Sequence, residues 1–261
     1  MGKIPQDIIG DIAILKFTRR TSWLIKKIKA KRFLREHKSV KTVLEKTEGF
    51  SGKLRTLKTK YLAGVKTKEA TYKENNCIFK YNVDESYFSP RLSNERKVIA
   101  DRVVKLSKKK ETKILVMFAG ISPYPIVVAK KLKQSGKQAT IISNELNKKA
   151  NIAGKKNIVL NKLQNIITLV DGNAKKLPIK LKEKFDIILM PRPNLDETFL
   201  KTALKLSKKG TVIFYHGFGT KKEVLEEIKR DIRNKIGKVS IRKAGDIGPY
   251  KYRWQAQFKV K

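Results

Sequence analysis

The chain has 261 residues, 40% of them hydrophobic, and 62 Lys and Arg against 23 Asp and Glu give a formal net charge of +39. This length suits a large domain with a smaller one attached, and no apolar run reaches the roughly 18 residues that a membrane span needs. A single cysteine excludes an internal disulfide, two separated histidines argue against a metal site, and the charge indicates nucleic acid as partner.

The N-terminal stretch lacks the layout of a signal peptide. Asp7, Gly10 and Asp11 interrupt its short apolar segment. We therefore expect a cytoplasmic protein without membrane contact, and we take it to be a monomer.

The first 80 residues predict a small α+β domain that binds RNA. Residues 9–17 are expected to form a strand opened by Gly10, and residues 22–37 place apolar side chains at helical spacing. Residues 49–56 combine a Gly/Ser turn with basic side chains. Further strands are expected at 41–47, 60–67 and 75–86.

Residues 81–261 alternate predicted strands and helices, which is typical of a mostly parallel sheet covered on both faces. Helices are expected at 94–110, 122–136, 146–163, 195–210 and 221–237. Strands are expected at 113–120, 137–145, 166–174, 185–191, 210–218 and 252–261. We predict an α/β, Rossmann-like sheet whose ligand binds beyond the carboxyl ends of the strands.

Three strand ends carry the candidate chemistry. Gly120 follows the first strand, but Ser122 stands where a second glycine would complete a dinucleotide fingerprint, so pyrophosphate binding is disfavoured. Glu145 ends the second strand, where a carboxylate accepts hydrogen bonds from ribose hydroxyls. Asn173 or Asp171 after the third strand could read an adenine edge. This order is typical of Rossmann-like methyltransferases, and the alternative is an ordinary α/β domain with polar loops.

Several segments together resemble a known family. YFSPRLSNER followed by MFAG is the most specific of them, and IGDIAILKF, GFSGKLRTLKTKYLAG, NIVLNKLQNIITLVDGNA, MPRP and ALKLSKKGTVIFYHGF occur in the same order. The chain resembles the archaeal and eukaryotic tRNA (guanine-37-N1)-methyltransferases over nearly its whole length. The resemblance implies S-adenosylmethionine as cofactor and the anticodon loop of tRNA, at position 37, as substrate.

The resemblance also implies two catalytic residues. Glu95 would assist removal of the guanine N1 proton, without which N1 is a poor nucleophile. Arg55 would hold guanine O6, where negative charge grows. Without the resemblance, Glu95 would be an acid at a helix N-terminus and Arg55 a surface residue facing phosphate.

The remaining site residues fall into two groups, and no metal is expected. The cofactor-binding candidates are Tyr87, Phe118, Gly120, Glu145, Leu146, Asn173, Ala174 and Pro191. The RNA-binding candidates are Arg91, Arg192, Asn194, Tyr250 and Lys251. A target base must leave its stack, and loop position 37 makes this easier than in a duplex. Candidates for stacking on bases, against a role in the core, are Tyr215, Phe218, Tyr250, Tyr252 and Trp254.

The sequence departs from the family in four places. Val116 replaces a usual acid, Ser122 replaces a glycine, and Pro191 replaces the asparagine of an N-L-P-x motif. In this motif the chain resembles an archaeal subgroup in which some members also methylate 4-demethylwyosine at C7. The family's small N-terminal domain, which reaches the outer corner of tRNA, is not found, and we expect nonspecific phosphate binding to compensate.

Two other functions remain open. A related enzyme transfers the aminocarboxypropyl arm of the same cofactor in wybutosine synthesis. Retention of Arg55 and Glu95 favours methyl transfer, because both serve proton removal at guanine. The departures at Val116, Ser122 and Pro191 leave room for a noncatalytic RNA-binding protein.

Overall fold

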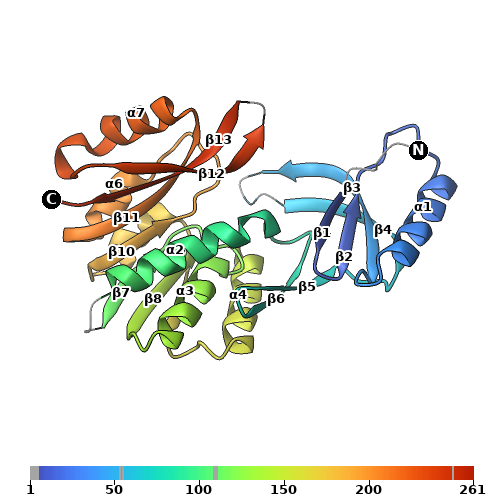
Figure 1. Cartoon of the computed structure of the whole chain (residues 1–261), viewed down its shortest axis with the longest axis horizontal. Helices are drawn as coiled ribbons and strands as arrows, with labels where there is room; N and C mark the ends of the chain where they lie inside the picture. Colours follow the sequence, from blue (N-terminus) through green and yellow to red (C-terminus); the bar gives the residue numbers. More distant parts are fainter. Residues whose placement is uncertain (1–5, 53, 55, 108–110, 249) are drawn as a thin grey trace.

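The protein is described here by a computed structural model covering residues 6–52, 54, 56–107, 111–248 and 250–261. A smaller unit with the N-terminus lies at one end of an elongated molecule, and a larger unit with the C-terminus lies at the other (Figure 1). Across the described residues, no helix is both long and apolar enough to cross a membrane.

The smaller unit is a four-stranded sheet covered on one face by a helix. Its strands lie in the order β1 (Gln6–Ile9), β2 (Ile12–Leu15), β3 (Thr42–Ser51) and β4 (Thr56–Gly64). Helix α1 (Trp23–Glu36) links the parallel strands β2 and β3 and buries Ala30 and Phe33 against the sheet. The strand expected at 9–17 is confirmed as the shorter β2, which begins at Ile12 because the chain first reverses at Gly10, where φ is +57°.

A two-stranded ribbon lies between the units and contacts both. It consists of β5 (Glu69–Glu74) and β6 (Cys77–Asn82). Toward the larger unit, Asn161 and Asn157 accept hydrogen bonds from the backbone N–H groups of Ile78 and Lys80 at 2.9 and 2.8 Å. Toward the smaller unit, Asp11 accepts one from the backbone of Thr71 at 2.8 Å. The predicted division between residues 80 and 81 falls within β6, and it stays a prediction.

The larger unit is a seven-stranded sheet in the order β12-β13-β11-β10-β7-β8-β9. Strands β7 (Thr112–Val116), β8 (Ala139–Glu145), β9 (Ile167–Asp171), β10 (Phe185–Met190) and β11 (Ser207–Gly219) are parallel. Strands β12 (Ser240–Gly248) and β13 (Lys251–Lys259) are antiparallel. This confirms the predicted, mostly parallel sheet.

Helices cover both faces of this sheet and form two separate cores. One face packs against α2 (Ser93–Leu106), α3 (Pro123–Gln134) and α4 (Lys148–Leu160). The other packs against α5 (Leu177–Lys180), α6 (Leu200–Lys205) and α7 (Lys221–Ile232). Short 3₁₀ turns occur at Pro90–Leu92, Ala174–Lys176 and Arg233–Lys235. All five parallel strands end toward the same edge, so their following loops meet there.

The expected helix at 195–210 is largely wrong. Only α6 is helical there, and the chain enters β11 at Ser207, opposite Phe185. Leu200, Ala203 and Leu206 supply the apolar spacing that predicted a longer helix, and all three are buried. The residues before α6 instead form a loop at the edge where the strands end.

Candidate functional site

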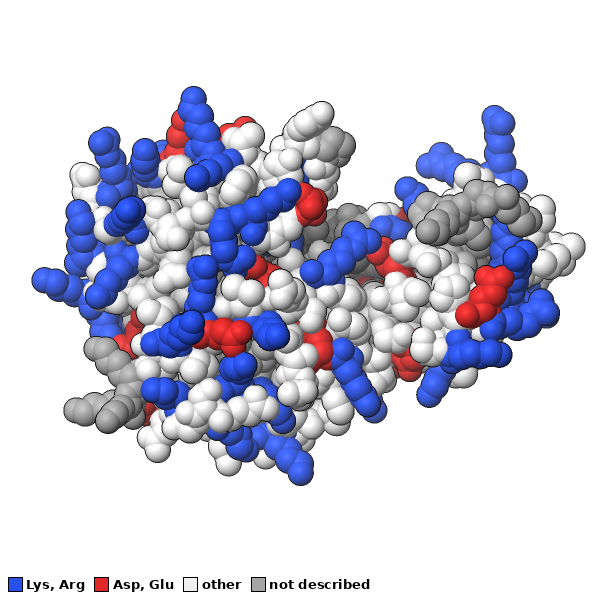
Figure 2. Space-filling model, in the orientation of Figure 1, with Lys and Arg blue, Asp and Glu red and all other residues white. Residues whose placement is uncertain are grey.

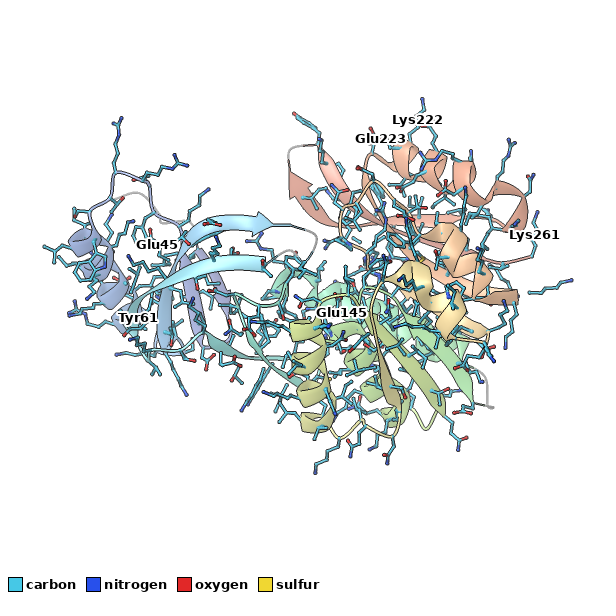
Figure 3. The ribbon with its side chains drawn as sticks, turned by 180° about the vertical axis from the view of Figure 1, so that it is seen from behind. Glu45, Tyr61, Glu145, Lys222, Glu223 and Lys261 are labelled. Carbon is cyan, nitrogen blue, oxygen red and sulfur yellow. The ribbon has the colours of Figure 1, made fainter. Side chains whose placement is uncertain are left out.

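A cavity of about 480 Å³ lies at the carboxyl edge of the larger sheet, within the size range of small-molecule sites. Figure 3 shows Glu145 on the side of the larger unit that faces the smaller one. The structure brings all of the predicted cofactor-binding residues to the wall of this cavity. These are Tyr87, Phe118, Gly120, Glu145, Leu146, Asn173, Ala174 and Pro191.

Glu145 and Gly120 are joined directly. The backbone N–H of Gly120 donates to Oε2 of Glu145 at 2.7 Å, and that of Asn147 donates to Oε1 at 2.8 Å. Burial raises the pKa of Glu145, and these N–H donors oppose the rise. Gly120 has φ +57°, which a side chain would strain. The turn therefore fixes a half-buried carboxylate at the cavity wall.

Of the two candidates for reading the adenine edge, Asn173 and Asp171, only Asn173 lines the cavity. Asn173 lines the cavity and accepts a hydrogen bond from the backbone of Lys175 at 2.9 Å. Asp171 is not among the lining residues. Asn144, which the sequence analysis missed, also lines the cavity and donates to the carbonyls of Val170 and Gly172 at 2.9 and 3.0 Å. The sequence feature that could have indicated Asn144 is a polar residue near the end of an otherwise mostly apolar strand.

Val116 and Ser122, two of the positions at which the sequence departs from the family, are buried. Val116 is fully buried in β7. Ser122 is buried in a left-handed conformation with φ +66°, and its Oγ lies 3.0 Å from Oγ of Ser143. A Cβ at Gly154 of α4 would lie 2.8 Å from that Oγ, so Gly154 leaves room for the serine. Ser122 thus adopts the left-handed backbone conformation that usually requires glycine at this position.

Arg192, one of the RNA-binding candidates, is buried. It is 3% exposed, and its guanidinium donates to the carbonyl of Leu195 at 2.6 Å and to Glu227 at 2.7 Å. The side chain therefore fixes the loop after β10 to helix α7. Arg192 also lines the cavity, and its role in RNA binding stays a prediction.

Glu95 lies behind the cavity wall and does not itself line the cavity. It is 4% exposed, and its Oε1 lies 2.7 Å from Nη2 of Arg242 and 3.2 Å from Nε2 of His216. His216, on β11, does line the cavity. Burial lowers the pKa of His216, which favours the neutral ring. Sequence analysis missed His216 as a site residue, although it stands at the polar end of an apolar strand.

The second catalytic candidate, Arg55, lies outside the described residues. Its neighbour Leu54 lines the cavity from the β3–β4 hairpin, so the smaller unit contributes to the site. Figure 1 shows this hairpin directed toward the larger unit. Among the described residues, no group of His, Cys, Asp and Glu is placed to hold a metal ion.

The other RNA-binding candidates lie outside this cavity. Arg91 is exposed and paired with Asp7. Asn194 and Lys251 line a separate open groove beside α7, and Tyr250 is 87% exposed in the turn between β12 and β13. Of the other stacking candidates, Tyr215 is buried and donates to Glu227, and Trp254 donates to the carbonyl of Gly219. Phe218 and Tyr252 are partly exposed.

A doubly wound sheet with a glycine turn and a strand-end carboxylate at one cavity has the architecture of a Rossmann-like methyltransferase. The sequence model of the TRM5/TYW2 methyltransferase domain matches residues 70–242, and the chain belongs to this family.

Known relatives agree with this assignment. The chain is 36% identical to the tRNA (guanine(37)-N(1))/4-demethylwyosine(37)-methyltransferase Taw22 of Nanoarchaeum equitans, over 95% of this chain and 96% of that protein. It is 32% identical to the tRNA (guanine(37)-N(1))-methyltransferase Trm5b of Pyrococcus abyssi, over 97% of this chain and 74% of that protein.

Solved structures share the fold along nearly the whole chain. Trm5b from Pyrococcus abyssi superposes with a TM-score of 0.81 at 29% identity, covering 98% of this chain and 75% of that one. The protein aTrm5, solved in complex with tRNALeu, gives a TM-score of 0.83 at 24% identity, covering 99% and 72%. The predicted Rossmann-like fold is therefore confirmed.

Proposed function

We propose that this chain transfers a methyl group from S-adenosylmethionine to N1 of guanosine 37 in tRNA. The observation that carries the proposal is that one cavity, at the carboxyl edge of a methyltransferase sheet, gathers every residue predicted to bind the cofactor. The names of the relatives from Nanoarchaeum equitans and Pyrococcus abyssi support the target nucleotide.

The cavity residues fit a nucleoside cofactor. A carboxylate offers about four acceptor positions, and Glu145 uses two of them on backbone N–H groups, which leaves capacity for ribose hydroxyls. Phe118, Leu146 and Pro191 supply apolar wall. When bound, the cofactor supplies an electrophilic methyl group on a sulfonium. The protein's own task is to hold this group and to prepare the target nitrogen.

Proton removal at guanine N1 is assigned to His216 with Glu95 behind it. His216 lines the cavity, whereas Glu95 is not among the lining residues and has its Oε1 3.2 Å from Nε2 of His216. With Nε2–H donated to Glu95, Nδ1 is the ring atom left to accept the proton from guanine N1 as the carbon–nitrogen bond forms. The resulting imidazolium is stabilised by the Glu95 carboxylate. Glu95 thus acts as a positioning residue in this arrangement.

The surface suits a nucleic-acid substrate. Figure 2 shows Lys and Arg spread over both units on the visible face, with few Asp and Glu between them. The net charge of +39 attracts phosphate without regard to sequence. A target base at position 37 lies in a loop, where it leaves its stack at lower cost than in a duplex.

Mass spectrometry of nucleosides tests the function. An unmodified tRNA transcript with guanosine at position 37, incubated with the protein and S-adenosylmethionine, should yield 1-methylguanosine. A transcript with adenosine at that position should yield none. Transfer of label from the cofactor's carboxyl group to tRNA would contradict the proposal, since that label marks aminocarboxypropyl transfer.

A second substrate is favoured by one comparison. The relative from Nanoarchaeum equitans also bears 4-demethylwyosine in its name, and its match covers 95% of this chain. We propose that the same cavity methylates C7 of 4-demethylwyosine at position 37. Incubation with tRNA carrying that base should give a product heavier by one methylene, and an unchanged base would restrict the enzyme to guanosine.

A further inference from the structure

Arg253 differs from the other permanently charged side chains in the cavity wall. The others have acidic partners: Arg96 pairs with Glu74, Lys175 with Glu197, and Arg192 with Glu227. Arg253 makes no hydrogen bond or ion pair with any described residue, and its Nε, like that of Arg192, is sealed from solvent without a partner. It is therefore the unpaired cation of the wall, within the part of the chain that the structure describes.

A partly exposed guanidinium whose Nε is buried without a partner can bind an anion from outside the protein. A buried donor without an acceptor costs free energy, more so when it is charged. Arg253 is also held in place, since its guanidinium lies 5.2 Å from the ring centre of Phe218, and Arg192 lies 5.7 Å from the same ring. An oriented, planar guanidinium binds two oxygens of a phosphate at once.

The position of Arg253 selects the RNA over the cofactor as the source of this anion. Arg253 stands on β13, opposite Phe218 of β11, whereas Glu145 ends β8, with β11, β10 and β7 between them. Its charge acts on His216, which also faces the cavity from β11. The arginine thus lies on the side where the target base enters, away from the ribose-binding carboxylate.

We infer that Arg253 binds a backbone phosphate of the RNA next to the target nucleotide. This rests on the proposed function, because it requires RNA to enter the cavity. The contact holds the extruded nucleotide by its phosphate while His216 meets the base. It adds position rather than sequence recognition, since phosphates carry no base identity.

The first experiment measures tRNA affinity against salt for Arg253→Gln and for Arg233→Ala. Arg233 is exposed and follows α7, whose C-terminal end approaches the opposite edge of the sheet, so this control removes the same charge away from the cavity. Arg253→Gln should weaken tRNA binding roughly tenfold to hundredfold more than the control. The slope of log K against log salt should fall by about 0.7, the value for one contact to a single strand.

The second experiment locates the phosphate. Complete tRNAs carrying one neutral methylphosphonate linkage, placed in turn at the phosphates flanking nucleotide 37, are bound to wild type and to Arg253→Gln. At one of these positions the methylphosphonate should weaken tRNA binding by the wild type and leave the tRNA affinity of Arg253→Gln unchanged. Equal losses for both proteins at every linkage would overturn the inference. Arg253→Lys, which keeps the charge, should restore part of the affinity if the variant's loss is not a folding defect.

Cofactor affinity separates the two anion sources. Titration with S-adenosylmethionine in the absence of RNA should give the same Kd for wild type and Arg253→Gln. A weaker cofactor complex with unchanged tRNA affinity would overturn the inference and assign Arg253 to the cofactor's carboxylate. Failure of the proposed function is recognised independently, because wild-type protein would then leave guanosine 37 unmethylated.

Discussion

His216 is the residue whose protonation state should control the rate. A general base must be neutral, and burial lowers the pKa of His216 from its ordinary value near 6.5. The neutral ring therefore dominates at pH 7, and turnover falls only as the pH drops through the lowered pKa.

We expect single-turnover rates with tRNA to be flat above about pH 6.5 and to decline below it. The variant His216→Gln should be slower, and its rate should lose this acid-side decline. A decline that persists unchanged in His216→Gln would show that another group titrates.

Glu95 gives a second prediction, because it positions the imidazole rather than touching the base. Glu95→Gln keeps the shape of the side chain but removes the charge that stabilises an imidazolium. Turnover should fall by about 10²–10⁴-fold, the usual contribution of general base catalysis, while the Kd for S-adenosylmethionine stays the same. Glu36→Gln, an exposed acid of α1, is the matched control for lost charge. A full-rate Glu95→Gln enzyme would remove this residue from the chemistry.

The sequence predicted the cofactor side of the site better than the base side. Gly120, Glu145 and Asn173 follow successive parallel strands, and the ends of such strands must meet at one edge. His216 and Arg242 meet Glu95 through the pairing of β11, β12 and β13 and the packing of α2. Antiparallel register is not encoded in the spacing of single residues, so this cluster could not be foreseen.

At the scale of elements, the contact between α3 and α4 depends on Ser122 and Gly154. In Gly154→Ala the new methyl group would lie 2.8 Å from Oγ of Ser122, so the variant should lose about 1–3 kcal/mol of stability through overpacking. In the Ser122→Gly background that oxygen is gone. The same substitution should then gain up to about 1 kcal/mol from helix propensity.

Chemical denaturation of the wild type, both single variants and the double variant measures this coupling. The effect of Gly154→Ala should change sign between the two backgrounds. Additive free energies of unfolding would mean that the two helices adjust independently, and that the serine is not accommodated by the glycine.

Elements were predicted well where periodicity and end signals agreed. Helix α1 begins after Ser22, whose side chain accepts from the backbone of Ile25, and α7 begins with a capping box from Thr220 and Glu223. Strand β12 was missed, because it is largely exposed at the sheet edge and lacks an apolar alternation. Its residues are strand only because β13 offers them a partner.

At the scale of the whole molecule, charge should dominate tRNA affinity. The surface carries the excess of a +39 chain, and each phosphate that a Lys or Arg neutralises releases counterions. If about 6–10 phosphates are contacted, raising salt from about 50 to 200 mM should lower tRNA affinity by roughly 10³–10⁵-fold.

Filter binding or fluorescence titration with tRNA over this salt range gives the slope of log K against log salt. S-adenosylmethionine supplies the internal control, because we propose that it binds within the cavity, at Glu145, Gly120 and the apolar wall. Its Kd should change little over the same range, so a parallel loss of both affinities would point to a salt effect on the fold. A shallow tRNA slope with tight binding would mean that shape and base contacts hold the RNA. The basic side chains spread over both units in Figure 2 would then serve solubility rather than recognition.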